Sequence, residues 1–166
     1  MSQLFDSGKE SGATFSPCRT WRYLLWRQWD ESLPTVMFIG LNPSTADETV
    51  NDRTISKCIK FAKTWGFGTY LMGNLYGIRS PYPRDIWVAE DPVGPGHDDV
   101  LRAAIGTAHR AVAAWGCESG IDHRANQVLE MIPEPYCLKV TKGGYPWHPL
   151  YVPGATEPIR YRTKSP

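Results

Sequence analysis

The sequence predicts an α/β fold with a mainly parallel central sheet. Short apolar segments of strand length alternate along the chain with longer segments in which apolar residues recur at helical spacing. The 166 residues have the length of one ordinary domain. With 42% hydrophobic and 21% charged residues, the composition is that of a globular protein and excludes a disordered or fibrous chain. No internal repeat or linker is visible, so residues 1–166 are expected to form a single domain.

The first half of the chain contains the clearest elements. Residues 1–17, rich in Ser, Gly and charge, predict a loose N-terminal tail or an edge segment. Residues 19–29 are dense in aromatics and arginine, and fit a strand or a short helix equally well. Residues 35–39 form an apolar run typical of a strand buried on both faces. Residues 52–65 carry apolar side chains at helical spacing, and Gly66 is a stop signal.

The second half continues the alternation of strands and helices after a second predicted strand. Its predicted elements are a strand over 69–72, a loop over 80–96, a helix over 98–108, a strand over 111–115, a helix over 122–131 and a strand over 136–140. This order favours parallel strands joined by helical crossovers.

A polar or glycine-containing turn follows each of the four predicted strands. Asn42 and Asn74 follow the first two strands, Trp115 and Gly116 end the third, and His148 lies in the turn after the fourth. In open α/β sheets, ligands bind in the crevice beyond the carboxyl ends of the strands. We therefore expect these four turns to converge on one cleft.

Each candidate residue also has a purely structural interpretation. Asn42 precedes Pro43, a pair that favours turns, although its amide can also hold a water or a base edge. Asn74 is equally consistent with a buried amide satisfied by the backbone. A lone histidine such as His148 is more often structural than catalytic, but a loop position at a cleft favours function.

No metal or cofactor site is predicted. His97 precedes Asp98 and Asp99, which suggests a metal ligand, but no second histidine lies at ligand spacing, so we interpret the acids as helix N-terminal residues. Phosphate-loop, dinucleotide-binding and nucleophile-elbow motifs are absent from the sequence. The four cysteines are widely spaced and are expected to be reduced thiols: Cys18, Cys58, Cys117 and Cys137.

Charge is distributed unevenly along a chain whose net charge is only +1. Residues 84–134 contain nine acidic and four basic residues, whereas residues 138–166 contain five basic residues and one acid. The bulk charge does not indicate a strongly basic nucleic-acid binder. The basic C-terminal stretch could still present a positive face to a polyanion, or the charges could simply be spread over a solvated surface.

Taken in order, the four turns resemble the motifs of the uracil-DNA glycosylase superfamily over residues 36–155. The first turn is similar to the glycine-x-acid-or-amide-proline motif, the second to the strand that ends in the base-binding Asn, the third to an apolar-Trp-Gly strand end and the fourth to a His-Pro motif. The matching segments are Gly40-Leu41-Asn42-Pro43-Ser44, Leu71-Met72-Gly73-Asn74 with Arg79, Ala113-Ala114-Trp115-Gly116 and Gly144-Tyr145-Pro146-Trp147-His148-Pro149-Leu150.

The chain as a whole is also similar to a bacterial and phage domain family of unknown function. That resemblance is close and nearly full-length. It rests on the runs Leu41-Asn42-Pro43-Ser44-Thr45-Ala46-Asp47, Asn74-Leu75 and His148-Pro149-Leu150-Tyr151.

The glycosylase resemblance implies a three-layer α/β/α sandwich and a DNA glycosylase that flips a pyrimidine out of double-stranded DNA. It implies that Asn74 binds the base edge, with Leu41 and Ser44 beside the base. Asn42 would position the attacking water, and His148 would donate a hydrogen bond to the departing base. A monomer with no cofactor is expected.

The same resemblance assigns DNA contacts to the last motif. Pro149, Leu150 and Tyr151 would wedge into the gap that the flipped nucleotide leaves. Arg79 would support its strand end or a phosphate. The basic C-terminal stretch would hold further phosphates, through Lys139, Lys142, Arg160, Arg162 and Lys164.

Two departures from the superfamily pattern bear on mechanism and substrate. Asn42 stands where the most active branch has Asp, so a strong general base is missing there, and either Asp47 or Asp52 is a candidate to replace it. Ser44 stands where an aromatic residue or glycine usually follows the proline, which leaves open the side of the pocket facing the pyrimidine 5-position. The cysteines also lack the paired N-terminal spacing of the iron–sulfur branches.

The open pocket favours a bulky modified cytosine as substrate, such as hydroxymethylcytosine or its glucosylated form, with a role in defence against phage DNA. Excision of uracil or a mismatched base, a non-catalytic nucleic-acid-binding module and an enzyme acting on free nucleosides remain alternatives. Residues 1–6 show neither a basic start nor an apolar core, and no apolar run reaches the length of a membrane span. A cytoplasmic protein without membrane association is expected.

Overall fold

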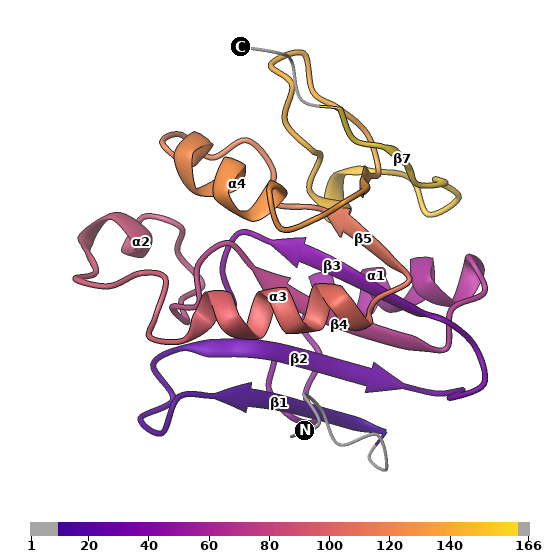
Figure 1. The fold of residues 1–166 in the computed structure, drawn as a ribbon, viewed down its shortest axis with the longest axis horizontal. Helices are drawn as coiled ribbons and strands as arrows, with labels where there is room; N and C mark the ends of the chain where they lie inside the picture. The colour runs from indigo at the N-terminus through magenta and orange to yellow at the C-terminus, as the bar shows by residue number, and fades with distance from the viewer. Residues whose placement is uncertain (1–9, 163–166) are drawn as a thin grey trace.

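A computed structural model describes residues 10–162, and its strands form one seven-stranded sheet with the order β1-β2-β4-β3-β5-β6-β7 (Figure 1). The strands are β1 (Ser11–Phe15), β2 (Arg22–Gln28), β3 (Thr35–Gly40), β4 (Thr69–Asn74), β5 (Arg110–Ala113), β6 (Pro135–Cys137) and β7 (Ile159–Arg160). The parallel arrangement predicted from the sequence holds for β4, β3, β5 and β6. Because β1, β2 and β7 pair antiparallel at the two edges, the whole sheet is mixed.

Helices cover both faces of the sheet, so the three-layer arrangement is confirmed. Figure 1 shows α3 (His97–Thr107) in front of the strands and α1 (Arg53–Thr64) behind them. The remaining helices are α2 (Asp85–Val88), α4 (Asp122–Leu129) and the 3-10 turn η1 (Pro149–Tyr151). Strand β3 divides its side chains between the two faces. Val36 and Phe38 pack with α1, whereas Met37 and Ile39 pack with α3 and α4.

Helix α1 confirms the helix predicted over residues 52–65. Asp52 is its N-cap, and the carboxylate accepts a hydrogen bond of 2.8 Å from the backbone N–H of Ile55. The apolar stripe is buried against the sheet through Ile55, Cys58 and Phe61. The helix ends before Gly66, whose φ of +87° is a left-handed conformation that favours glycine.

The structure decides between the alternatives that the sequence left open for the N-terminal part of the chain. Residues 11–15, predicted within a loose tail or edge segment, form the edge strand β1, while residues 1–9 lie outside the described part of the chain. The polar composition fits an edge strand, because only Gly12 of β1 is buried, under the ring of Trp26. Residues 19–29, which fitted a strand or a helix, contain β2, whose hydrogen bonds with β1 and β4 decide between the two.

Two further predictions about elements were wrong in part. The predicted loop over 80–96 contains the short helix α2. The strand predicted over 136–140 ends at Cys137, because its neighbour β5 ends at Ala113 and the chain then leaves the sheet. Lys139 instead accepts a backbone hydrogen bond from Trp147, which folds the following turn back toward the cleft. Within residues 10–162, no helix has the length and apolar character needed to cross a membrane.

Candidate active site

A cleft of about 490 Å³ lies at the carboxyl ends of the parallel strands. All four turns predicted to converge there contribute to its lining, through Asn42, Asn74, Trp115 with Gly116, and His148. The predicted base-binding residues Leu41 and Ser44 line it as well. The prediction that these turns converge is therefore confirmed, and the cleft is the candidate active site.

Backbone hydrogen bonds lock the turns after β3 and β4 together. The carbonyl of Gly40 accepts a 2.9 Å bond from the N–H of Leu75, and the carbonyl of Pro43 accepts one of 2.9 Å from the N–H of Ser80. The amide nitrogen of Asn42 adds a side-chain link, because it donates to the carbonyl of Ser80 at 3.0 Å and to that of Ile78 at 3.3 Å. One wall of the cleft is thus held in place before any ligand binds.

Asn74 lies at the floor of the cleft with an amide that the protein does not satisfy. The side chain is 1% exposed, and neither its amide nitrogen nor its amide oxygen has a hydrogen-bond partner within residues 10–162. Gly40 leaves the room for this amide, since a Cβ there would lie 2.9 Å from Oδ1 of Asn74. Buried amides are normally paired, so an unpaired one lining a cleft indicates a ligand with a complementary donor and acceptor.

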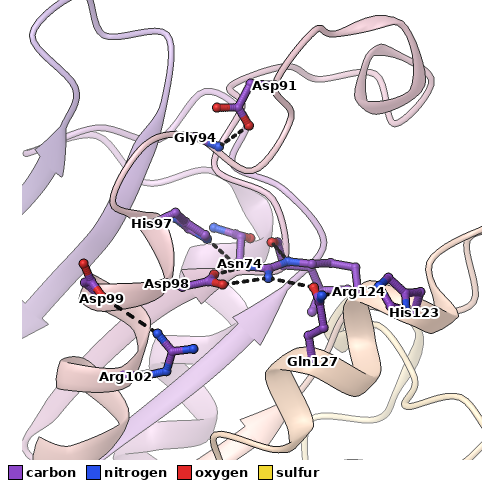
Figure 2. A network of polar contacts seen from close by, with 11 residues as sticks. Asn74, Asp91, Gly94, His97, Asp98, Asp99, Arg102, His123, Arg124 and Gln127 are labelled. Carbon is purple, nitrogen blue, oxygen red and sulfur yellow. Dashed lines mark hydrogen bonds and ion pairs between the residues drawn. The ribbon is translucent and has the colours of Figure 1, made fainter.

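The backbone behind Asn74 is supported by two helices (Figure 2). Nε2 of His97, on α3, lies 2.7 Å from the carbonyl oxygen of Asn74. Nε of Arg124, on α4, donates to the carbonyl of Leu75 at 2.8 Å, and the same guanidinium is clamped by Asp98 at 2.5 Å. His97 and Arg124 thus hold the backbone at the end of β4, and Asp98 holds the guanidinium of Arg124 in place.

His97 is therefore a positioning residue. Burial lowers the pKa of His97, so the ring is neutral and donates its Nε2–H to the Asn74 carbonyl. Asp98 and Asp99 lie in the first turn of α3, as predicted. Across the described residues, no group of three or more His, Cys, Asp or Glu side chains is arranged to hold a metal ion, and the four cysteines form no disulfide.

His148 lines the cleft, and one of its two ring nitrogens is already engaged by the backbone. Its Nδ1 accepts a 3.2 Å bond from the backbone N–H of Leu150, as the N-cap of η1. Burial lowers the pKa of His148, an effect that the charge of Asp52 partly opposes. The ring is consequently neutral at pH 7 with its proton on Nε2.

Two carboxylates line the cleft, those of Asp52 and Glu118. Of the two acids that the sequence offered as a general base, Asp47 and Asp52, the structure places only Asp52 in this lining. Asp52 lines it beside His148, with one carboxylate oxygen used to cap α1. Asp47 does not line it, because its carboxylate accepts hydrogen bonds from the backbone N–H groups of Thr49 and Val50. The second carboxylate is Glu118, in the loop after β5, which the sequence did not single out.

Arg22, at the start of β2, also lines the cleft and was not predicted. Its side chain is 2% exposed, and burial lowers its pKa to about 10, so it remains charged at pH 7. A register shift in the β1–β2 pairing leaves Tyr23 without a partner, because Phe15 pairs with Arg22 and Thr14 with Leu24. Such irregularities re-aim side chains. The available signal was that β2 carries two arginines, Arg22 and Arg27, among its apolar residues.

The predicted DNA contacts are only partly gathered at the cleft. Leu150 and Tyr151 line it, and Tyr151 is 74% exposed, but Pro149 is buried and packs inside the protein. Arg79 lies in a shallow groove that adjoins the cleft, with its guanidinium 4.6 Å from the ring centroid of Phe15. Lys142 is exposed and does not line the cleft.

Apart from Arg22, which lines the cleft itself, positive charges lie beside the cleft on α1 rather than on the C-terminal stretch. A groove along this helix, here called the α1 groove, shares Asp52 and Leu150 with the cleft. Its remaining lining residues are Asn51, Arg53, Ser56, Lys57, Lys60, Phe61 and Gly154. In the C-terminal stretch, by contrast, Arg160 is paired with Glu134 and Lys139 lies over the ring of Trp147, while residues 163–166 lie outside the described chain.

The fold and the cleft define an α/β protein with a cleft at the carboxyl edge of its parallel strands. The chain belongs to the family described as "Protein of unknown function (DUF1643)", whose model matches residues 22–150. That range includes Arg22, Asn42, Asn74 and His148. Neither the curated proteins nor the solved structures contain a match to the chain.

Proposed function

We propose that this protein is a DNA glycosylase that flips a modified pyrimidine into the cleft and excises it. The observation that carries the proposal is the unpaired amide of Asn74 at the floor of the cleft. An amide presents an acceptor and a donor side by side. Its oxygen would accept from N4–H of cytosine or N3–H of uracil, and its nitrogen would donate to N3 of cytosine or O4 of uracil.

His148 supplies the second half of the chemistry. When water attacks C1′ of the sugar, the N-glycosidic bond breaks and its electron pair leaves with the base, which carries the negative charge on N1 and O2. The Nε2–H of a neutral His148 would donate to that oxygen, and such donors are worth about 10²–10³ in rate. The products are an abasic sugar with a hydroxyl at C1′ and a base that is protonated after release.

Asn42 would orient the attacking water, and Asp52 would accept its proton. The amide nitrogen of Asn42 is occupied by backbone carbonyls, so its free oxygen can orient a water but cannot take up a proton at neutral pH. Asp52 carries the carboxylate needed to accept that proton. In this proposal Asp52 replaces the general base that an Asn at position 42 cannot provide.

The small side chain of Ser44 and the size of the cleft favour a substituted pyrimidine. A volume of about 490 Å³ falls within the range of roughly 300–1,000 Å³ that is typical of small-molecule sites. Hydroxymethylcytosine and its glucosylated form are therefore the preferred substrates, with phage DNA as their source. Uracil, which needs less room, is the second choice.

The deciding experiment scores abasic sites by alkaline cleavage of oligonucleotides. The substrates carry hydroxymethylcytosine, glucosylated hydroxymethylcytosine, uracil or a mismatched base, and cleavage at one of them is expected. DNA binding without cleavage of any substrate at high enzyme concentration would overturn the proposal in favour of a non-catalytic binding module. Release of base from free nucleosides, with no requirement for DNA, would instead indicate a nucleoside hydrolase.

The α1 groove is the proposed path of the DNA backbone away from the cleft. It presents Arg53, Lys57 and Lys60 on one helix, and none of these has a carboxylate within ion-pair distance among the described residues. Lys57 donates to the carbonyl of Val152, which fixes its position beside η1. Unpaired basic side chains next to a nucleotide site are suited to phosphate contacts.

Removing two of these charges is expected to weaken DNA binding for every sequence. The double variant Arg53→Gln, Lys60→Gln should raise Kd at low salt and reduce the slope of log K against log[salt] by about 2, since each phosphate contact contributes about 0.9. Filter binding or fluorescence anisotropy over a salt series measures the slope. The matched control is Arg102→Gln, Arg110→Gln, which lies at the amino ends of the strands. An equal loss of slope in both variants would show only a non-specific effect of net charge.

A neutral His148 predicts an acid limb in the pH profile. Burial lowers the pKa of His148, and protonation would place a hydrogen on Nδ1 against the N–H of Leu150. We expect kcat to be steady above about pH 6.5 and to fall as the pH drops through the lowered pKa. The stability that this group contributes follows the same direction: it is present above the unfolded-state pKa and lost below the folded-state one.

The control for this limb is His148→Gln, whose side chain does not titrate. Its kcat should be lower by about 10²–10³ and should lack the part of the limb that belongs to the histidine. An unchanged limb in His148→Gln would assign the titration to another group.

A further inference from the structure

We propose that Arg22 binds an oxyanion of the ligand, so that the cleft selects a nucleotide through a negative charge as well as through its base edge. The inference rests on the proposed function only in taking that ligand to be a nucleotide. The anionic group has two possible sources, the phosphate of the flipped nucleotide and an acidic substituent on the base. Both would present a pair of acceptor oxygens to the guanidinium.

The contrast between two buried arginines of β2 carries the argument. Arg27 is 7% exposed and makes five hydrogen bonds that use Nε and both terminal nitrogens. The side chain of Arg22, 2% exposed, makes one hydrogen bond to the residues that the structure describes, from Nη1 to the carbonyl of Ala46 at 3.0 Å. Arg27 is fully used by the protein and does not line the cleft, whereas Arg22 lines the cleft and is largely unused.

The unused atoms of Arg22 form the edge that recognises an oxyanion. Nε is buried without a partner, and neither Nε nor Nη2 makes a hydrogen bond within residues 10–162. These two nitrogens are parallel donors that match a carboxylate or phosphate in a bidentate arrangement. A guanidinium has no acceptor, so a base edge that offers only donors cannot satisfy it.

The charge of Arg22 is not neutralised by the protein either. No carboxylate lies within 4.0 Å of it among the described residues, whereas Arg19, Arg124 and Arg160 each have one. Asp52 is the carboxylate that acts on Arg22 through longer-range attraction, and one of its oxygens already caps α1. Burying an unpaired charge destabilises a fold, so a bound anion that completes the site would explain why it is there.

The test compares Arg22→Met with the matched control Arg27→Met. If Arg22 serves the ligand, replacing it with an apolar side chain of similar length should leave the Tm unchanged or raise it. Arg27→Met should lower the Tm, because it leaves five acceptors without their donor. If Arg22→Met loses as much stability as Arg27→Met, Arg22 is structural and the inference is overturned.

Binding experiments then separate the two sources of the oxyanion. Titration calorimetry compares deoxycytidine monophosphate with deoxycytidine, and oligonucleotides carrying carboxycytosine with those carrying hydroxymethylcytosine. A preference of about tenfold or more for the phosphorylated or the carboxylated member identifies the source, and Arg22→Met should abolish that preference. Arg22→Lys, which keeps the positive charge but lacks the paired donors of the guanidinium, should recover part of this preference.

These outcomes are independent of whether the protein cleaves DNA. No preference for either anionic probe in the wild-type protein, or an equal preference in Arg22→Met, would overturn the inference. An Arg22-dependent preference without any abasic sites would overturn the glycosylase proposal and leave the oxyanion site standing. If Arg22→Met leaves the excision of both neutral and acidic bases unaffected, the oxyanion site is overturned and the glycosylase proposal stands.

Discussion

Asp52→Asn is expected to lower the single-turnover rate of base excision by about 10²–10⁴-fold, the usual contribution of a general base. Asp52 lines the cleft and lies near enough to His148 for its charge to raise the pKa of that ring. Asparagine keeps the shape of the side chain but cannot accept the proton of the attacking water. The loss should therefore fall on kcat, with little change in the affinity for DNA.

The substitution is unusually clean because asparagine is as good an N-cap as aspartate. The hydrogen bond to the N–H of Ile55 can be kept, so circular dichroism and thermal melting should show an intact α1. Two control variants remove a charge nearby: Asp47→Asn, which lies outside the cleft, and Glu118→Gln, which lines it. A larger loss in Glu118→Gln than in Asp52→Asn would move the general base to the loop after β5.

The central part of the fold was predictable because its signals are local. Strand β3 and helix α1 are specified by a continuous apolar run and by apolar residues at helical spacing, and the stop at Gly66 reflects a left-handed conformation. The edge strand β1 could not be distinguished from a tail, because it buries a single glycine and owes its shape to pairing with β2. Edge strands carry little hydrophobic pattern, and tertiary pairing decides them.

The residues of the cleft likewise include some that the sequence could predict and others that it could not. The four turns could be assigned to one cleft because parallel strands place their carboxyl ends at the same edge of a sheet. Arg22 and Asp52 could not be assigned to the cleft from the sequence. The position of Arg22 depends on a register shift between β1 and β2, and that of Asp52 depends on how α1 packs on the sheet. His97 and Arg124 act through backbone carbonyls of the β4 end, contacts that leave no pattern in the sequence.

The residues that the sequence could not predict include those that support the backbone of the cleft. The sequence predicted residues that line the cleft, whereas the structure adds a support for one of them, in which side chains of α3 and α4 hydrogen-bond to the carbonyls of Asn74 and Leu75 (Figure 2). A base-binding amide needs such support, because a displacement of about 1 Å is enough to cost a large factor in rate. The preformed geometry of the cleft is thus a property of three layers rather than of one loop.

Asn74→Ala is expected to abolish base recognition without weakening the fold. The amide makes no hydrogen bond within the described part of the chain, so its removal breaks no hydrogen bond and relieves the desolvation of two buried polar atoms, each worth about 1–3 kcal/mol. The Tm should stay the same or rise, while excision falls by about 10²-fold or more. Thermal melting and single-turnover cleavage of the same preparation measure both effects.

Asn42→Ala provides the opposite expectation in the same cleft. Its amide nitrogen donates to the carbonyls of Pro43, Ile78 and Ser80, so its loss should lower stability by roughly 1 kcal/mol or more along with activity. Substitution by alanine should lower the stability if the asparagine has a structural role, as expected for Asn42. It should leave the stability unchanged if the asparagine binds a ligand, as expected for Asn74. If Asn74→Ala unfolds the protein or leaves excision unchanged, the amide is not the base-binding group, and the observation on which the proposed function depends is lost.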